Sequence, residues 1–260
     1  MIKLIVSDID GTLLEDGTNM LNPELFEVIL KLRAGGIQFA AASGRQWVSI
    51  ESVFDPVKEK IFYLSDNGAY VGCHGRSLFI NEMEHSLVME LIRDIRSNGL
   101  IPMICAPDFI YLDRRDADLY QWLINGYQYR IKLVDDLQQA EGAFIKVSAY
   151  REQKIEQVSG QLWERYRHKT KMAYAGDMWL DFMAPEVNKG QAVRLLQESL
   201  QIKPEETMAF GDQMNDMEML KQAYYSFAIG NARPEVKAAA RFQSDTNQRD
   251  GVLKILKLLL

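Results

Sequence analysis

The sequence predicts an α/β fold, a Rossmann-like parallel sheet core with an inserted α+β domain. Two observations lead to this class. Short apolar runs typical of buried strands alternate with amphipathic helices at both ends of the chain, which favours a parallel sheet with helices on both faces. Between these two parts the pattern changes to short paired strands beside helices, which is typical of an α+β unit.

The N-terminal part begins with a buried strand, because an apolar run over residues 2–6 stops at Ser7-Asp8. Asn22-Pro23 then indicates a helix start, with a capping Asn and a Pro in the first turn. The apolar face of this helix consists of Leu25, Val28, Ile29 and Leu32, and Gly35-Gly36 ends it. Two more buried strands are predicted over residues 37–42 and 61–64.

The middle part starts after Asn81 with a helix whose apolar face is made by Val88, Leu91, Ile92 and Ile95. Short strands are predicted over residues 100–105, 109–112, 143–149, 171–175 and 178–183, and helices over residues 117–127 and 152–165. After Pro185 the first pattern returns, with a helix opened by Asn188-Lys189-Gly190 and buried strands over residues 207–210 and 226–229. We therefore predict a core of residues 1–82 and 186–260 and an inserted domain of residues 83–185.

Charge and composition exclude several classes of protein. Lys and Arg total 30 against 36 Asp and Glu, a net charge of −6, which argues against nucleic acid as a partner. No stretch approaches the roughly 20 apolar residues of a membrane span, and the N-terminus lacks the features of a signal peptide, so we expect no membrane partner. The two cysteines, Cys73 and Cys105, are too few for a disulfide framework and favour a cytoplasmic location.

Polar residues follow three of the predicted strands. The first strand leads to Asp8 and Asp10, the second to Ser43-Gly44, and the strand over residues 207–210 to Asp212. Ligands of a parallel sheet bind beyond the carboxyl ends of its strands, so we expect these residues to lie together. Three carboxylates in one place repel one another unless a cation holds them, and oxygen ligands without His or Cys fit Mg²⁺.

Four motifs carry a resemblance to a known family. They are Asp8-x-Asp10-Gly11-Thr12, Ser43-Gly44-Arg45, Asn188-Lys189-Gly190 and Gly211-Asp212-x-x-Asn215-Asp216. In order and spacing, with a large insertion between the second and the third, the chain resembles the Cof-type phosphatases of the haloacid dehalogenase superfamily. Further matching segments are Ser65-Asp66-Asn67-Gly68-Ala69, Gly230-Asn231-Ala232 and Asn247-x-x-Asp250-Gly251-Val252. The chain departs from the family at Gln248-Arg249, where an acidic pair is common.

The chemistry of a phosphate monoester suggests the central roles. Asp8 is the candidate nucleophile, which forms a covalent aspartyl-phosphate that water then hydrolyses. Two anions meet in that step, so Mg²⁺ held by the carboxylates of Asp8 and Asp212 would screen them. Ser43 and the backbone amide of Gly44 would bind phosphoryl oxygens, and Lys189 would neutralise the charge on them.

The resemblance implies the remaining roles. Asp10 would be a metal ligand through its backbone carbonyl, which leaves its carboxyl free to act as general acid and then as general base. Asn215 would contact substrate or phosphate. Asp216 would orient Lys189 without being a metal ligand itself. The inserted domain would be a cap that closes over the site and contacts the leaving group.

We therefore predict an enzyme, a Mg²⁺-dependent phosphatase whose partner is a small phosphorylated metabolite such as a sugar phosphate. The nearest alternative is a phosphomutase that uses the same Asp pair to transfer a phosphoryl group between two hydroxyls of one sugar. A different class is a catalytically weak regulator that binds a phosphorylated metabolite. The presence of Asp8, Asp10, Lys189 and Asp212 argues against such a regulator.

Overall fold

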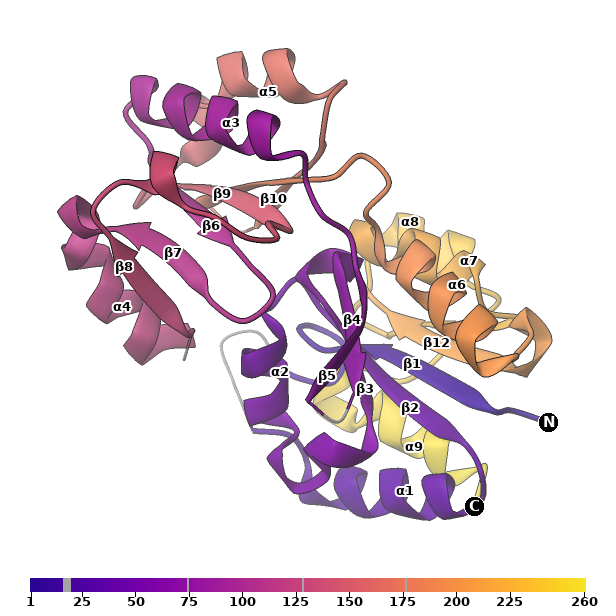
Figure 1. Ribbon diagram of the computed structural model, residues 1–260. Coiled ribbons are helices and arrows are strands. Elements are labelled where there is room, and N and C mark those ends of the chain that lie inside the picture. Colours follow the sequence, from indigo (N-terminus) through magenta and orange to yellow (C-terminus); the bar gives the residue numbers. More distant parts are fainter. Residues whose placement is uncertain (16–19, 74, 128, 176) are drawn as a thin grey trace. The chain divides into compact units, whose positions relative to one another are not determined.

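The computed structural model describes residues 1–15, 20–73, 75–127, 129–175 and 177–260 (Figure 1). Contacts among these residues divide the chain into two units. The core unit comprises Met1–Phe79 and Asn188–Leu260, and the insert unit comprises Ile80–Val187. The core unit is thus assembled from two separate stretches of sequence.

A sheet of mixed direction forms the centre of the core unit. Its described strands are, in spatial order, β14 (Phe242–Gln243), β13 (Tyr225–Ala228), β12 (Thr207–Gly211), β1 (Leu4–Asp8), β2 (Gln38–Ala42), β3 (Phe62–Ser65), β4 (Tyr70–Cys73) and β5 (Arg76–Ile80). The strands from β14 to β3 pair in parallel, and β4 runs antiparallel to β3. The predicted α/β fold with a parallel sheet is confirmed, and β4 and β5 extend it at one edge. The sequence analysis did not predict β4 or β5. In β5 the apolar stretch is only three residues long, Leu78 to Ile80, and every residue of the strand except Phe79 is exposed.

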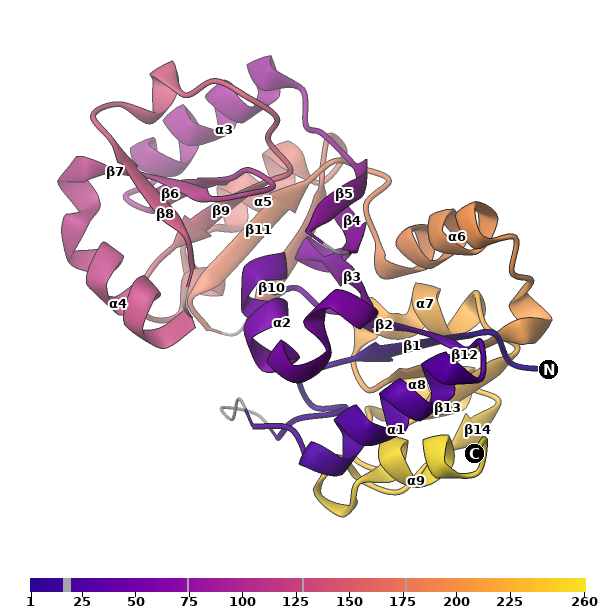
Figure 2. The same ribbon diagram turned by 60° about the horizontal axis from the view of Figure 1, so that its bottom comes forward.

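Helices cover both faces of this sheet (Figure 2). α6 (Lys189–Leu200) and α7 (Met217–Lys221) lie on one face, and α1 (Pro23–Ala34) and α9 (Gly251–Lys257) lie on the other. α8 (Pro234–Ala239) lies on the α6 face, since its Val236 belongs to the same buried cluster as Leu196 of α6. Helix α2 (Trp47–Val53) follows β2. This arrangement leaves the carboxyl ends of β12, β1 and β2 beside one another at one edge of the sheet.

The insert unit contains a second sheet with mostly antiparallel pairing. Its described strands are, in spatial order, β10 (Lys171–Ala175), β11 (Trp179–Met183), β9 (Lys146–Tyr150), β6 (Ile101–Cys105), β7 (Ile110–Asp113) and β8 (Ile131–Val134). Only β7 and β8 pair in parallel among these strands. The helices α3 (His85–Ser97), α4 (Ala117–Tyr127) and α5 (Gly160–Tyr166) accompany this sheet.

One predicted helix of the insert unit is shorter than expected. The prediction placed a helix over residues 152–165, but α5 begins only at Gly160. Lys154 has a left-handed backbone, with φ at 55°, which a right-handed helix does not accommodate, and a short 3₁₀ turn follows over Ile155–Gln157. Among the described residues of the whole chain, no helix combines the length and apolar character needed to cross a membrane.

Helix α1 forms as its sequence predicts. The Asn22 side chain accepts a hydrogen bond from the Glu24 N–H at 3.0 Å, and the Leu25, Val28, Ile29 and Leu32 side chains are buried. Leu30 lies on the opposite side and is 44% exposed, whereas Leu32 is 2% exposed. The two leucines therefore offer a matched pair within one helix.

We expect Leu32→Ala to lower the free energy of unfolding by about 2–5 kcal/mol, because it leaves a cavity beneath α1. Leu30→Ala removes the same atoms from a half-exposed position and should cost well under about 1 kcal/mol. Urea unfolding of both variants, followed by circular dichroism, measures the difference. Equal losses in the two variants would contradict the assigned orientation of α1.

Candidate active site

Three neighbouring strands end where the candidate side chains begin. Asp8 is the last residue of β1, Ser43 follows the last residue of β2, and Asp212 follows the last residue of β12. β1 lies between the other two and pairs with each of them in parallel. The sheet thus brings three polar residues that are distant in sequence to one edge, where they face the same space.

Lys189 enters this edge from the first turn of α6. The Asn188 side chain caps that helix by accepting a hydrogen bond from the Gln191 N–H at 2.8 Å. Gly190 lets α6 approach its neighbour closely, because a Cβ there would lie 2.5 Å from the Glu218 backbone oxygen. Lys189 is itself 1% exposed.

The Lys189 ammonium contacts two carboxylates. Its Nζ lies 2.6 Å from Oδ1 of Asp8 and 2.5 Å from Oδ1 of Asp216. The other Asp216 oxygen accepts hydrogen bonds from the backbone N–H groups of Asp212 and Gln213, each at 3.0 Å. Both oxygens of Asp216 are therefore engaged by the protein, and the position of Lys189 follows from that of Asp216.

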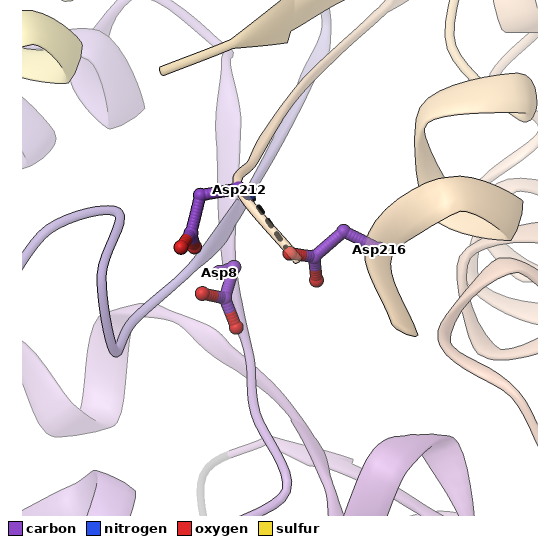
Figure 3. A group of neighbouring side chains, drawn as sticks. All are labelled: Asp8, Asp212 and Asp216. Atoms are coloured by element: carbon purple, nitrogen blue, oxygen red, sulfur yellow. Dashed lines mark hydrogen bonds between the residues drawn. The ribbon is translucent and has the colours of Figure 1, made fainter. Parts of the chain in front are cut away.

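Asp8, Asp212 and Asp216 form a buried carboxylate cluster (Figure 3). One oxygen from each lies within 4.8 Å of the others, and the Asp8 and Asp212 carboxylates point toward the same space. Gly211 makes this approach possible, because a Cβ there would lie 2.5 Å from the Asp216 Cβ. Within this cluster the Lys189 ammonium contacts Asp8 and Asp216, whereas Asp212 accepts hydrogen bonds from Thr12 and Gln213.

Burial and the repulsion between carboxylates disfavour the ionised forms of Asp8 and Asp212. Burial and the Asp216 charge raise the pKa of Asp8 well above its usual range, although Lys189 opposes the shift. Burial also raises the pKa of Asp212, against the hydrogen bond from Thr12. For Lys189, burial lowers the pKa, but the charges of Asp216 and Asp8 outweigh it and raise the pKa overall. For Asp8, the effect of burial on the pKa thus exceeds that of the Lys189 ammonium, and for Asp212 it exceeds that of the hydrogen bond from Thr12.

Asp10 lies outside this cluster and has a different partner. Its carboxylate accepts two hydrogen bonds from the Arg45 guanidinium and a longer contact of 3.4 Å from the Ser43 hydroxyl. The resemblance assigns only its backbone carbonyl to the metal, and the separation of its carboxylate from the cluster is compatible with that assignment. The carboxylate itself contacts Arg45 and Ser43.

Thr12 holds the Asp212 carboxylate, a contact that the sequence analysis did not anticipate. Its hydroxyl donates to Oδ1 of Asp212 at 2.8 Å. Gly11 has a left-handed φ of +83°, and a Cβ there would lie 2.4 Å from Oδ2 of Asp212. Glycine is therefore required in the first motif both by its backbone and by the close carboxylate. The motif itself was the signal for both residues, although their role needed the structure.

Asn215 contacts Asn67. Asn67 lies in the loop of residues 65–69, a segment that the sequence analysis matched to the family without assigning it a role. The Asn215 side-chain NH₂ donates to Oδ1 of Asn67 at 3.1 Å, and the Asn67 N–H donates to the Ser43 carbonyl at 3.0 Å. Asp66, Asn67 and Gly68 all have positive φ, at 49°, 57° and 97°. Such a run costs conformational energy and is typical of a functional loop. Through Asn67, this loop contacts both Ser43 of the second motif and Asn215 of the fourth.

The donor set fits a hard divalent cation. Asp8 and Asp212 offer oxygen ligands, and the described cluster contains no His or Cys. Burial raises the pKa of both carboxyls, an effect that a bound cation would offset. A sheet edge that joins such a cluster to a buried lysine defines an enzyme site for an anionic group. This combination is typical of α/β hydrolases that bind an anionic substrate group beside a buried aspartate.

Comparison with known proteins specifies the family. The chain belongs to the haloacid dehalogenase-like hydrolases, whose family model matches residues 5–256. It is 30% identical over 261 residues to the 5-amino-6-(5-phospho-D-ribitylamino)uracil phosphatase of Escherichia coli, with 100% of this chain and 96% of that protein covered. It is also 25% identical over 290 residues to a phosphatase of Bacillus subtilis, with 100% of each chain covered.

Solved structures agree with this assignment. A crystal structure from Eubacterium rectale has a TM-score of 0.92 and 33% sequence identity, and covers 100% of this chain and 99% of that one. A haloacid dehalogenase-like hydrolase from Bacteroides thetaiotaomicron has a TM-score of 0.87 and 25% identity, and covers 100% of both chains. The protein is an enzyme, a phosphatase of the haloacid dehalogenase superfamily, as the sequence predicted.

We expect Asp212→Asn to stabilise the protein in the presence of a chelator. Because the folded-state pKa of Asp212 is raised, the wild type is favoured while this carboxyl is protonated and loses stability as pH rises through the raised pKa. Asn does not ionise, so the advantage of the variant in melting temperature should grow between pH 4 and pH 8. Added Mg²⁺ should raise the melting temperature of the wild type only.

Asp135→Asn provides the matched control, since the Asp135 side chain is 90% exposed and lies in the insert unit. Its melting temperature should follow the wild type with and without Mg²⁺. If Asp212→Asn melts below the wild type in chelator at pH 8, the ionised Asp212 is already compensated within the chain.

Proposed function

We propose that this phosphatase hydrolyses small phosphorylated metabolites through an aspartyl-phosphate on Asp8, with Mg²⁺ as its cofactor. The observation that carries the proposal is the position of Asp8, buried at the end of β1 between the Lys189 ammonium and the Asp212 carboxylate. A carboxylate held in this way is oriented for attack on phosphorus, and the burial that raises its pKa also excludes bulk water from its surroundings.

The first step transfers the phosphoryl group to Asp8. One Asp8 oxygen attacks phosphorus in line with the departing alkoxide, and the P–O bond to the alkoxide breaks. The Ser43 hydroxyl and the Gly44 amide bind phosphoryl oxygens, while the Lys189 ammonium offsets the charge that they carry. Mg²⁺, held by the Asp8 and Asp212 carboxylates with the Asp10 backbone carbonyl, would supply the positive charge that lets two anions approach.

Asp10 carries the proton in both steps. Its carboxyl protonates the departing alkoxide in the first step. In the second step the resulting carboxylate takes a proton from the water that attacks phosphorus, and the bond between phosphorus and the Asp8 oxygen breaks. Free Asp8 and inorganic phosphate result, and Asp10 is again protonated. Asp216 holds Lys189 in place from outside the metal site, and Asn215 contacts the bound phosphate or substrate.

The relatives narrow the substrates worth testing. One is named for a ribitylaminouracil phosphate, in which a primary alcohol carries the phosphate. We infer that primary alkyl phosphates of sugars, polyols and nucleoside-like compounds are the substrate class here, and that the insert unit, predicted over residues 83–185, is the cap that recognises their leaving group. A cytoplasmic location agrees with such substrates.

The experiment that tests the proposal is phosphate release across a panel of phosphorylated metabolites, with Mg²⁺ and with excess chelator. We expect Mg²⁺-dependent release by the wild type and a loss of at least about 10³-fold in Asp8→Asn, because the amide of the variant is a poor nucleophile. Asp55→Asn, at a position of the core unit where the side chain is 71% exposed, serves as the matched control. Activity of Asp8→Asn above a tenth of the wild type, or full activity in chelator, would overturn the proposal.

A second prediction concerns Asp10 and the leaving group. An alkoxide leaves poorly without a proton, so Asp10→Asn should slow the first step with an alkyl phosphate by about 10²–10⁴-fold. Nitrophenolate leaves readily without one, so the same variant should still be phosphorylated by nitrophenyl phosphate. Because the second step lacks its base, the phospho-enzyme should accumulate, which rapid-quench measurement detects. Equal slowing of the first step with both substrates and no trapped phospho-enzyme would exclude Asp10 as acid and base.

A further inference from the structure

Arg45 forms an ion pair with Asp10 that the roles above do not use. Its Nε lies 2.9 Å from Oδ2 of Asp10, and its Nη2 lies 2.5 Å from Oδ1. Nε and Nη2 thus contact different oxygens of the same carboxylate. This parallel, two-bond geometry fixes the plane of a carboxylate, which a single point charge does not do.

The backbone of Arg45 is fixed on both sides. Its N–H donates to the Ser43 hydroxyl at 3.1 Å, and its carbonyl accepts from the Asp66 N–H at 2.9 Å. The Arg45 side chain is 19% exposed, compared with 38% for the Asp10 side chain. The Arg45 side chain therefore extends from an anchored backbone to a carboxylate that is more exposed than the guanidinium.

We propose that Arg45 is a positioning residue for Asp10. The inference rests on the proposed function, in which the Asp10 carboxyl exchanges protons with the leaving group and with water. Proton exchange needs an oxygen of Asp10 at a defined place, whereas an aspartate with this exposure has several side-chain conformations available. The Ser43 hydroxyl reaches the same carboxylate only at 3.4 Å, so the Arg45 pair is the contact that selects one conformation.

A double-mutant cycle tests whether Arg45 acts through Asp10. The rate constant of dephosphorylation is measured for the wild type, Arg45→Ala, Asp10→Asn and the double variant, each phosphorylated with nitrophenyl phosphate. Displacing a catalytic group costs about 10–100-fold, so we expect this slowing from Arg45→Ala in the wild-type background. In the Asp10→Asn background it should cost less than about threefold, because there is no base left to position.

Equal slowing in both backgrounds would overturn the inference, since Arg45 would then act independently of Asp10, for example on the phosphoryl group itself. If the wild type forms no phospho-enzyme, the proposed function fails and the inference with it. Arg33→Ala is the matched control, because Arg33 is also partly buried in the core unit and hydrogen-bonded, to Gln38 and to the Lys60 carbonyl. It should leave the rate constant unchanged.

Arg45→Lys separates orientation from charge. Lysine keeps the positive charge but cannot place two parallel donors on one carboxylate. Both Arg45→Lys and Arg45→Ala should lose the orientation of the Asp10 carboxylate. We therefore expect their dephosphorylation rate constants to lie within about threefold of each other. Recovery of the wild-type rate by Arg45→Lys would show that charge alone suffices and would contradict the positioning role.

Discussion

Buried negative charge is the constraint on which the core unit depends. Asp8, Asp212 and Asp216 are 4%, 2% and 0% exposed, and the Lys189 ammonium contacts Asp8 and Asp216 but not Asp212 among the described contacts. An uncompensated buried charge costs several kcal/mol. The neighbouring contacts reduce this cost, through two backbone N–H groups on Asp216 and the Thr12 hydroxyl on Asp212. The proposed Mg²⁺ would bind between Asp8 and Asp212 and offset the negative charge that remains there.

Close backbone packing supplies the precision that such a site requires. Side chains larger than hydrogen would collide at Gly11, Gly190 and Gly211, because a Cβ at each would lie within 2.5 Å of a neighbouring atom. These glycines belong to three different motifs and act on three different contacts: the Asp212 carboxylate, the approach of α6 to α7, and the position of Asp216. The motifs therefore contain residues that are needed for close packing as well as residues with reactive side chains.

The sequence predicted the elements that carry strong local patterns. Helix α1 has a cap, a proline and a clear apolar face, and β1, β2, β3 and β12 are apolar runs that end in polar residues. The order of the motifs was enough to place Asp8, Ser43, Lys189 and Asp212 near one sheet edge. It was not enough to pair individual atoms, because Arg45 and Asp10 are far apart in sequence and their contact depends on the register of β1 against β2. The edge strand β5 and the break at Lys154 depend on tertiary context, which local periodicity does not contain.

The divided core unit has a consequence for the order in which the protein forms during synthesis. β1 pairs with β12, and Lys189 contacts Asp8 across 181 positions of sequence. The insert unit is continuous, so all of its strands leave the ribosome while β1 still lacks one neighbour. Until β12 arrives, β1 is an edge strand with unpaired backbone groups, a state open to pairing with another chain. The site can therefore form only after Lys189, Asp212 and Asp216 have been added, and a nascent chain that ends before Asp216 lacks part of it.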